Sequence, residues 1–501
     1  GFQNAINGVY TQVVRIQSGD TYASANQLMS ALMDTGTDNM YAPYRNGAGR
    51  VLNEWGDRAR PDESSFNNVW RWLYQIINAS NNIIAEAENA SFEWSDAGRN
   101  EAIAHGKLFR AFGYYHLMNL FGDVPLLLEP SSGSNIRFDF ERTPVDVVRL
   151  QVLEDLEFAA LHLPTVPPKS GMVSKGVAQI YLGRVYLAKA GKTAPYEQAD
   201  LQKALEHTSD LIDNGPFSIV TERFGVQANE PGTPFTDMFI DGNETFEQGN
   251  TETVWSFQNE YALSGTAENH NIMRRWNVNR YYNFGLAITA ERGGRGIGRH
   301  GPTNFMMSLY HPDDDRGSDF AWRTYYVYEE GDNLPSGKSV GDTVFVFDPS
   351  VEEKTLTANR PSPRKWDSSI PEDISGSRQY DDQPFMRLAM AYLLLGEAQY
   401  KLGDLTGAAA TFNVLRDRAN APRITPADLN IDWILDERAR ELYGEERRRY
   451  TLLRNGKWLE RTRLHNKVAS PNIEDFHVLY PIPQEVIDAN NQVEMRQNPG
   501  Y

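Results

Sequence analysis

Three groups of aromatic residues stand in polar, loop-like stretches of this sequence, next to amide and guanidinium side chains. Trp55 lies in the stretch YAPYRNGAGRVLNEWGDRARP, Trp276 lies in RRWNVNRYYNF, and Trp322 is followed closely by Tyr325 and Tyr326. A flat apolar ring packs against the C–H face of a sugar, while Asn and Arg donate hydrogen bonds to its hydroxyl groups. Ordinary burial explains any single ring more simply. The three groups together favour a surface platform for a saccharide.

The glycine-rich segment GIGRHG matches the dinucleotide-binding pattern at Gly296, Gly298 and Gly301. That pattern holds a pyrophosphate only when a strand precedes it and a helix N-terminus follows it. Here the segment ITAERGGR precedes it, and Pro302 follows the last glycine at once. We therefore predict a loop and no nucleotide site.

Other acidic and histidine patterns do not form a metal or catalytic site. The three consecutive Asp residues of HPDDDRG (311–317) lack the alternate spacing of a calcium loop, so we predict a turn or an Asp–Arg cluster. The nine His form no HExxH, no Cys is present to bind zinc, and no GxSxG marks a serine hydrolase. We expect no metal and no cofactor. A glycosidase needs only two carboxylic acids, and the 67 acidic residues leave that function open without singling out a pair.

The segment ILDERARELYGEERRRYTLLRNG (434–456) is dense in both charges. Its Glu and Arg residues alternate at helical neighbour spacings, where opposite charges pair along one helix face. The pattern favours a salt-bridged helix over an anion-binding site.

The elements that must position these residues are mostly helical up to about residue 220. Apolar stripes at 70–84 and 104–118 recur at steps of three and four residues, which predicts two helices. Gly122 marks the end of the second helix. The apolar stretch NLFGDVPLLLEP (119–130) then predicts a buried corner, where the chain packs back on the helices.

Two helical hairpins have the aromatic, glycine and alanine spacing of tetratricopeptide units, the second more clearly than the first. The first hairpin begins at Ser174 as a helix cap, and the second begins with Pro384 at a helix start. Between them, residues 221–383 lose the helical period and are punctuated by Gly, Pro, Asn and Asp. The pieces 252–258 and 342–347 in that region predict short strands.

The bulk composition limits the partners. A net charge of −18, from 49 basic and 67 acidic residues, argues against nucleic acid and against an anionic membrane surface, so a neutral partner is favoured. No run of about 18 apolar residues occurs, so we expect no membrane span. A length of 501 residues favours two or three subdomains.

Seven ordered blocks give the sequence a resemblance to a known family. They include WRWLYQIINASNNIIAEAE, KLFRAFGYYHLMNLFGDVPLL, SKGVAQIYLGRVYLAKAG, RLAMAYLLLGEAQYKLGD, LRDRANAP, DERARELYGEERRRYTLLRNGKW and the ending LYPIPQEVIDANNQVEMRQNPGY. Over nearly its whole length the chain resembles the SusD/RagB family, whose members are glycan-binding outer-membrane lipoproteins of Bacteroidetes.

The resemblance implies a mainly α fold, with tetratricopeptide-like hairpins as a scaffold and an irregular ligand-binding face. It implies a single domain, 1–501, with scaffold at 1–220 and 384–460, ligand-binding loops at 221–383 and a C-terminal extension at 461–501. It further implies a non-enzymatic protein that captures oligosaccharide or polysaccharide at the cell surface. Such proteins act as a lid over a SusC-like TonB-dependent transporter in the outer membrane.

Family members are anchored through a lipidated N-terminal cysteine, which this sequence does not contain. We therefore interpret the chain as truncated, and a lipid anchor is implied by the resemblance alone. The family's ligand sites imply aromatic residues from the regions 38–60 and 260–330. The candidate glycan-binding residues are Trp55, Trp276, Tyr281, Tyr282, Trp322, Arg45, Arg50 and Asn277. Two alternatives stay open: a glycoside hydrolase on a helical scaffold, and a peptide-binding uptake protein of the same fold.

Overall fold

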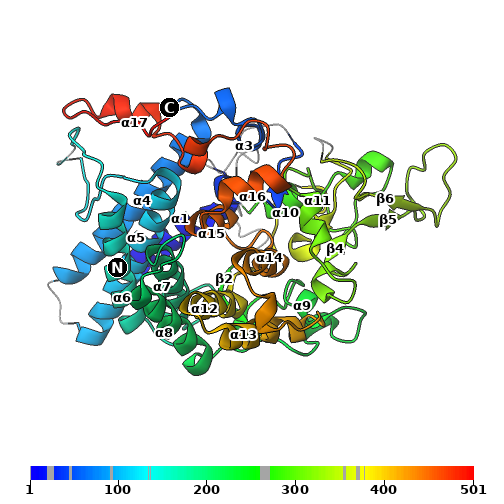
Figure 1. Ribbon diagram of the computed structural model, residues 1–501, viewed down its shortest axis with the longest axis horizontal. Helices are drawn as coiled ribbons and strands as arrows, with labels where there is room; N and C mark the ends of the chain where they lie inside the picture. The colour runs from blue at the N-terminus through cyan, green and yellow to red at the C-terminus, as the bar shows by residue number, and fades with distance from the viewer. Residues whose placement is uncertain are drawn as a thin grey trace.

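The computed structural model describes residues 2–19, 28–44, 48–90, 94–133, 135, 137–259, 271–353, 357–367, 370, 373–376 and 378–501. Long helices occupy one side of the molecule, and irregular segments with short strands occupy the other (Figure 1). The long helices are α1 (Phe2–Val13), α4 (Ser64–Glu88), α5 (Asp96–Phe121), α6 (Val145–His162), α7 (Lys175–Lys189), α8 (Gln198–Asn214), α12 (Leu388–Leu402) and α13 (Leu405–Arg418).

The long helices pack in chain order, each against the next. α4 packs on α5, α5 on α6, α6 on α7 and α7 on α8. α12 then packs on α8 and α13 on α12, so two hairpins that are distant in the sequence form one continuous array (Figure 1). The predicted scaffold of helical hairpins is confirmed.

Small residues determine how α5 begins, how it packs on α4 and where it ends. The Ser95 side chain caps the start of α5 by accepting a hydrogen bond from the Gly98 N–H at 3.2 Å. A Cβ atom at Gly113 would lie only 2.6 Å from Cγ1 of Ile77, so glycine lets the two helices approach closely. α5 ends before Gly122, whose φ of 73° is a conformation that glycine adopts without strain.

The corner after α5 packs against the helices as predicted, but only in its first part. Val124 is buried and exchanges two backbone hydrogen bonds with Thr143, at 3.2 and 2.9 Å. The Tyr74 hydroxyl of α4 donates to the Pro125 carbonyl at 2.7 Å. Leu128 is 38% exposed, so the buried stretch ends before it.

The prediction that Pro384 starts a helix is wrong. Pro384 belongs to strand β8 (Gln383–Arg387), which pairs antiparallel with β2 (Thr253–Phe257), and α12 begins only at Leu388. Pro384 lies opposite Ser256, next to an irregularity in the register. A proline is tolerated at such a place because no regular ladder hydrogen bond is required of it.

The other described strands form short pairs in the irregular region. They are β1 (Met40–Tyr41) with β3 (Gly301–Pro302), β4 (Trp322–Arg323) with β7 (Ser362–Pro363), and β5 (Tyr325–Val327) with β6 (Thr343–Phe345). β2 and β6 confirm the two strands predicted from the sequence. The shorter helices are α2 (Ala31–Asp34), α3 (Ala48–Glu54), α9 (Pro234–Asp237), α10 (Met273–Asn277), α11 (Asn304–Ser308), α14 (Ile431–Leu442), α15 (Arg448–Arg454), α16 (Trp458–His465) and α17 (Gln484–Ala489).

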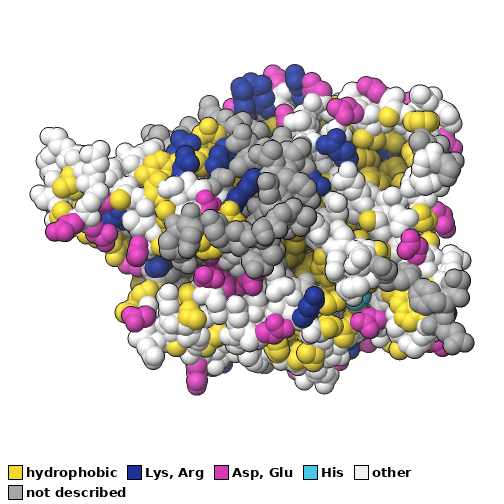
Figure 2. Space-filling view, turned by 180° about the vertical axis from the view of Figure 1, so that it is seen from behind, with side chains coloured by type: hydrophobic (Ala, Val, Ile, Leu, Met, Phe, Trp, Pro, Cys, Tyr) yellow, Lys and Arg dark blue, Asp and Glu magenta, His cyan; other side chains and the backbone are white. Residues whose placement is uncertain are grey.

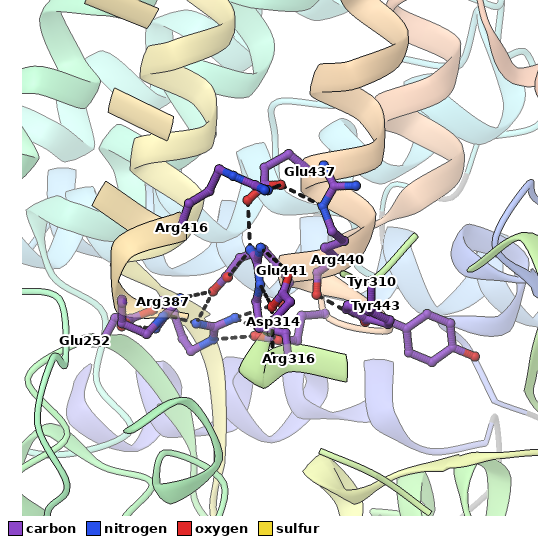
Figure 3. Close-up of polar contacts among 12 residues, drawn as sticks. Glu252, Tyr310, Asp314, Arg316, Arg387, Arg416, Glu437, Arg440, Glu441 and Tyr443 are labelled. Atoms are coloured by element: carbon purple, nitrogen blue, oxygen red, sulfur yellow. Dashed lines mark hydrogen bonds and ion pairs between the residues drawn. The ribbon is translucent and has the colours of Figure 1, made fainter. Parts of the chain in front are cut away.

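Buried charges link the helical array to the irregular region (Figure 3). The carboxylate of Glu441, on α14, accepts hydrogen bonds from Arg418 of α13 at 2.5 Å, from Arg387 of β8 at 3.0 Å and from Arg316 at 3.1 Å. All four side chains have an exposure of 0%. Arg316 comes from the short turn Asp315–Gly317, so one carboxylate joins four separate elements.

Two more carboxylates extend this network. Glu252 accepts from Arg387 at 2.6 Å and from Arg418 at 2.9 Å. Glu437 accepts from Arg316 at 2.9 Å. Burial by itself would raise the pKa of Glu437, but the surrounding guanidinium groups outweigh it and lower the pKa to about 2.

The network corrects the interpretation of 434–456 as a helix with charges paired along one face. The segment forms two helices, α14 and α15, and most of its charges pair with other elements. Arg454 pairs with Glu397 of α12, and Arg448 forms two hydrogen bonds to Asp38, at 2.8 and 2.7 Å. Periodicity shows which residues share a helix face, but not that another charged element covers that face. The predicted Asp–Arg cluster at 311–317 is confirmed by the buried pair between Asp314 and Arg316.

Removing the central carboxylate charge should destabilise the fold strongly. In Glu441→Gln, three buried arginines keep their charge but lose the negative charge and one of the two acceptor oxygens that they share, and breaking comparable buried ion pairs costs about 3–5 kcal/mol. We expect a large fall in the urea midpoint of unfolding, or no folded protein. Glu460→Gln, at a side chain that is 62% exposed, is the matched control and should change stability by less than about 0.5 kcal/mol. Equal stability of the two variants would contradict a central role for Glu441.

The low pKa of Glu437 predicts a loss of stability in acid. In the unfolded chain the pKa of a Glu carboxyl group is about 4.3. Between that pH and a pH of about 2, the folded protein therefore binds fewer protons at Glu437 than the unfolded chain does. The contribution of Glu437 is therefore complete above about pH 4.5 and disappears as the pH falls towards 2. Urea unfolding at a series of pH values should show the midpoint falling below about pH 4.5. A midpoint that is constant from about pH 5 to about pH 3 would contradict this.

Candidate functional site

Most of the rings expected on the surface are buried instead. Trp55 has an exposure of 0% and packs in the main core, with its ring centroid 5.4 Å from that of Trp458 and 6.0 Å from that of Tyr480. The guanidinium of Arg449 lies 5.6 Å above the Trp55 ring. Trp55 is therefore part of a structural cluster of rings, which corrects the expectation of an exposed residue.

The same correction applies to four candidates of the irregular region. Trp276, Asn277, Tyr281 and Trp322 are exposed by only 1%, 1%, 0% and 3%. The Asn277 side chain donates to the Met273 carbonyl within its own helix at 2.9 Å. These loops enclose apolar contacts of their own, and burial of a large ring out of water is favourable even without a periodic pattern.

Three of the predicted glycan-binding residues are not among these buried ones. Tyr282 is half-buried, and its hydroxyl donates to the Gly296 carbonyl at 3.0 Å. Arg50 is exposed and pairs with Glu54 at 3.4 Å. Arg45 lies outside the described residues. Contact of Tyr282 and Arg50 with a ligand stays a prediction.

The two regions expected to form the site do meet. β1 pairs with β3, which joins the loop around residue 40 to the irregular region near residue 300. Just beyond β1, the half-buried ring of Tyr44 lies close to two guanidinium groups. The Cζ atoms of Arg299 and Arg280 are 4.8 and 5.1 Å from the Tyr44 ring centroid, within range of a cation–π contact.

Further arginines lie close to Arg280 and Arg299. Burial lowers the pKa of Arg275, and the nearby positive charges of Arg295, Arg378 and Arg280 lower it further. Burial also lowers the pKa of Arg299 to about 10, with Arg275 and Arg280 adding to the effect. These shifts require positive charges close enough to repel one another. We call Tyr44, Tyr282, Arg275, Arg280, Arg295 and Arg299 the arginine–tyrosine cluster.

The glycine-rich segment explains how these arginines come together. The backbone of Ile297 and Gly298 donates to the carbonyls of Arg275 and Val278, at 2.9 and 2.8 Å, so the two segments run side by side. A Cβ atom at Gly296 would lie 1.9 Å from the Val278 oxygen. Gly296 and Gly298 thus allow close backbone packing in a loop, as predicted, whereas Gly301 lies in β3. Among the described residues, no strand leads into Gly296 as in a dinucleotide site.

The sequence contains a signal for this cluster that aromatic residues alone do not show. Between residues 274 and 299 it has six arginines and one acidic residue, Glu291, although the whole chain is acidic. A second surface feature is the ring pair Tyr325 and Phe345 across β5 and β6, which are 39% and 71% exposed. In DTVFVF, apolar residues occupy both faces of the strand, which indicates an exposed ring.

Some other classes of site find no support in the described residues. Among them, no group of three or more His, Asp or Glu side chains is placed to hold a metal ion. No helix within the described ranges combines the length and the apolar character needed to cross a bilayer.

Comparison with known proteins agrees with the fold. A family model described as "SusD family" matches residues 251–501. The chain belongs to the SusD family. A second family model, described as "Starch-binding associating with outer membrane", matches residues 2–187 of this SusD-family protein.

Individual relatives are similar over the whole chain or part of it. A SusD-like protein of Formosa agariphila is 25% identical over 515 residues, covering 100% of this chain and 92% of that protein. The starch-binding protein SusD of Bacteroides thetaiotaomicron is 39% identical over 125 residues, which cover 24% of this chain and 22% of that protein.

Solved structures show the same fold. A SusD superfamily protein from Parabacteroides distasonis has a TM-score of 0.76 at 17% identity, covering 100% of this chain and 98% of that one. The surface glycan-binding protein A of Bacteroides fluxus has a TM-score of 0.73 at 19% identity, covering 100% of this chain and 99% of that one.

The close packing at Gly296 gives a testable prediction. Gly296→Ala introduces a Cβ atom that collides with a backbone oxygen, and such overpacking costs about 1–3 kcal/mol. We expect a lower thermal midpoint of unfolding. Gly133→Ala is the matched control, because nothing lies within 4 Å of the position of its Cβ atom. A Gly296→Ala variant as stable as Gly133→Ala would show that the two segments do not pack as described.

Proposed function

We propose that this SusD-family protein is a non-catalytic carbohydrate-binding protein, which captures oligosaccharide or polysaccharide on the arginine–tyrosine cluster. The observation that carries the proposal is the partly exposed ring of Tyr44 with the guanidinium groups of Arg280 and Arg299 beside it. The ring suits the C–H face of a sugar, and the guanidinium N–H groups suit its oxygen atoms. The starch-binding and glycan-binding descriptions of the relatives support the same class of ligand.

The proposal extends to location and partner. We place the protein at the outer face of the outer membrane, held by a lipid anchor, where it passes its ligand to a SusC-like TonB-dependent transporter. The family description that mentions the outer membrane supports the location. Co-expression with a SusC-like transporter from the same gene cluster should yield a stable complex through detergent purification. Complete separation of the two proteins during that purification would oppose the partnership.

The two tyrosines of the cluster should matter for binding. Because they offer the partly exposed rings of this cluster, Tyr44→Ala and Tyr282→Ala should each weaken retardation in affinity gels that contain the best-bound polysaccharide. Loss of one stacked ring costs about 1 kcal/mol, or roughly fivefold in affinity. Trp276→Ala and Trp322→Ala should instead lower the thermal midpoint, because their rings are buried.

Two exposed rings elsewhere serve as controls for this experiment. Phe138→Ala removes a ring that is 41% exposed in the connection between α5 and α6, and it should bind as the unchanged protein does. Phe345→Ala tests the ring pair on β5 and β6. Loss of binding in Phe345→Ala, with none in the two tyrosine variants, would move the site to that hairpin.

The absence of catalysis is tested on the same samples. Incubation of the purified protein with its best-bound polysaccharide should release no new reducing ends. A steady increase in reducing ends would favour a glycoside hydrolase. Binding of peptides with no binding to any glycan of an array would favour peptide uptake on the same fold.

A further inference from the structure

We infer that the saccharide bound by the arginine–tyrosine cluster is acidic and carries carboxylate or sulfate groups. This inference rests on the proposed function and names the chemical class of its ligand. It comes from the pairing of the arginines within and around the cluster.

The cluster arginines differ from their neighbours in the sequence. Arg274 is paired with Asp373 at 3.8 Å, and Arg292 is paired with Asp332 at 2.7 Å. Arg275 and Arg280 are partly exposed and have no carboxylate within 4.0 Å in the described part of the chain. Acidic partners are therefore available to this segment, and among the described residues they pair with Arg274 and Arg292 and not with Arg275 or Arg280.

Single donor atoms of these side chains also lack acceptors. The Nε atoms of Arg275 and Arg280 have no hydrogen-bond acceptor in the described ranges, and the same is true of Nε and Nη1 of the paired Arg274. The guanidinium of Arg295 reaches a backbone oxygen, that of Ser375 at 3.3 Å, and no carboxylate among the described residues. A donor left without an acceptor in a partly buried position is unfavourable until an acceptor arrives with a ligand.

The positive charges also repel one another. Burial and the neighbouring arginines together lower the pKa values of Arg275 and Arg299, as described above. The protein as a whole has a net charge of −18, so this cluster is not part of a generally basic surface. On the face drawn in Figure 2, several Lys and Arg side chains lie in the upper centre, and a few Asp and Glu side chains lie beside the topmost of them. An anionic ligand would remove this repulsion, whereas a neutral ligand would not.

The chemistry of the groups selects an acidic saccharide. Guanidinium groups bind carboxylate and sulfate oxygens through paired, charge-assisted hydrogen bonds. The partly exposed ring of Tyr44, close to Arg280 and Arg299, adds an apolar surface for the pyranose face. Arg299 is only 3% exposed, so Arg280 is the guanidinium beside the ring that a charged sugar can contact.

The experiment compares acidic and neutral polysaccharides on the same protein. Affinity gels would contain polygalacturonate (carboxylate), carrageenan (sulfate), amylose or laminarin (both neutral). We expect stronger retardation by at least one acidic polysaccharide than by either neutral one, and the retardation should weaken as the salt concentration rises. Retardation by polygalacturonate or by carrageenan distinguishes the two anionic groups.

A charge-matched pair of variants locates the effect. The double variant with Arg275→Gln and Arg280→Gln should bind the acidic polysaccharide about tenfold or more weakly, because charge-assisted hydrogen bonds are lost. Arg137→Gln with Arg496→Gln removes the same charge at side chains that are 59% and 83% exposed, and should bind as the unchanged protein does. Thermal unfolding of both variants checks that each is folded.

The outcomes separate this inference from the proposed function. Retardation by amylose or laminarin, with none by the acidic polysaccharides, would overturn the inference and leave the proposed function intact. Retardation by none of the four would overturn both. Equal losses in the two double variants would show a general charge effect and overturn the inference. Binding of single-stranded DNA that is lost with Arg275→Gln and Arg280→Gln, without binding of any acidic polysaccharide, would replace the saccharide with a nucleic acid.

Discussion

The fold depends on buried carboxylates that are shared between arginines of different elements. Glu441 joins α13, α14, β8 and the turn at Arg316, and Arg316 lies 125 residues before Glu441 in the sequence. A buried charge without a partner is very costly, so each arginine restricts where its element can lie. The result is that the irregular segments are held against the helical array, which long apolar helices alone would not determine.

The irregular region is therefore an ordered structure with contacts of its own, and this decides which residues are available to a ligand. Its rings Trp276 and Trp322 join the main hydrophobic core, and Tyr281 and Tyr326 belong to a second, smaller core of the irregular region. Backbone packing at Gly296 and Gly298 then joins the segment of Arg295 and Arg299 to that of Arg275 and Arg280, and Arg280 and Arg299 contact Tyr44 from the N-terminal part of the chain.

Local charge and total charge lead to opposite expectations about the ligand. A net charge of −18 favours a neutral partner, because distant acidic groups repel an anion. The arginines next to a bound ligand affect its binding energy more than the distant acidic groups do. The reason is that interactions between charges separated by more than about 10 Å are largely screened in physiological salt. The arginine–tyrosine cluster is a place where this local term is positive in an otherwise acidic protein.

Sequence patterns predicted several of the long helices, the end of α5 at Gly122, two of the short strands and the family, because these depend on short-range features: apolar periods, caps and glycine stops. The sequence also showed the density of arginine between residues 274 and 299. It did not determine that Pro384 lies in a strand, because the partner strand β2 is more than a hundred residues away. Burial of Trp55 and the pairing of Glu441 with three arginines were likewise decided by tertiary contacts. The physical reason is common to all three: whether a ring is exposed, or a charge is paired, depends on which distant segment covers it.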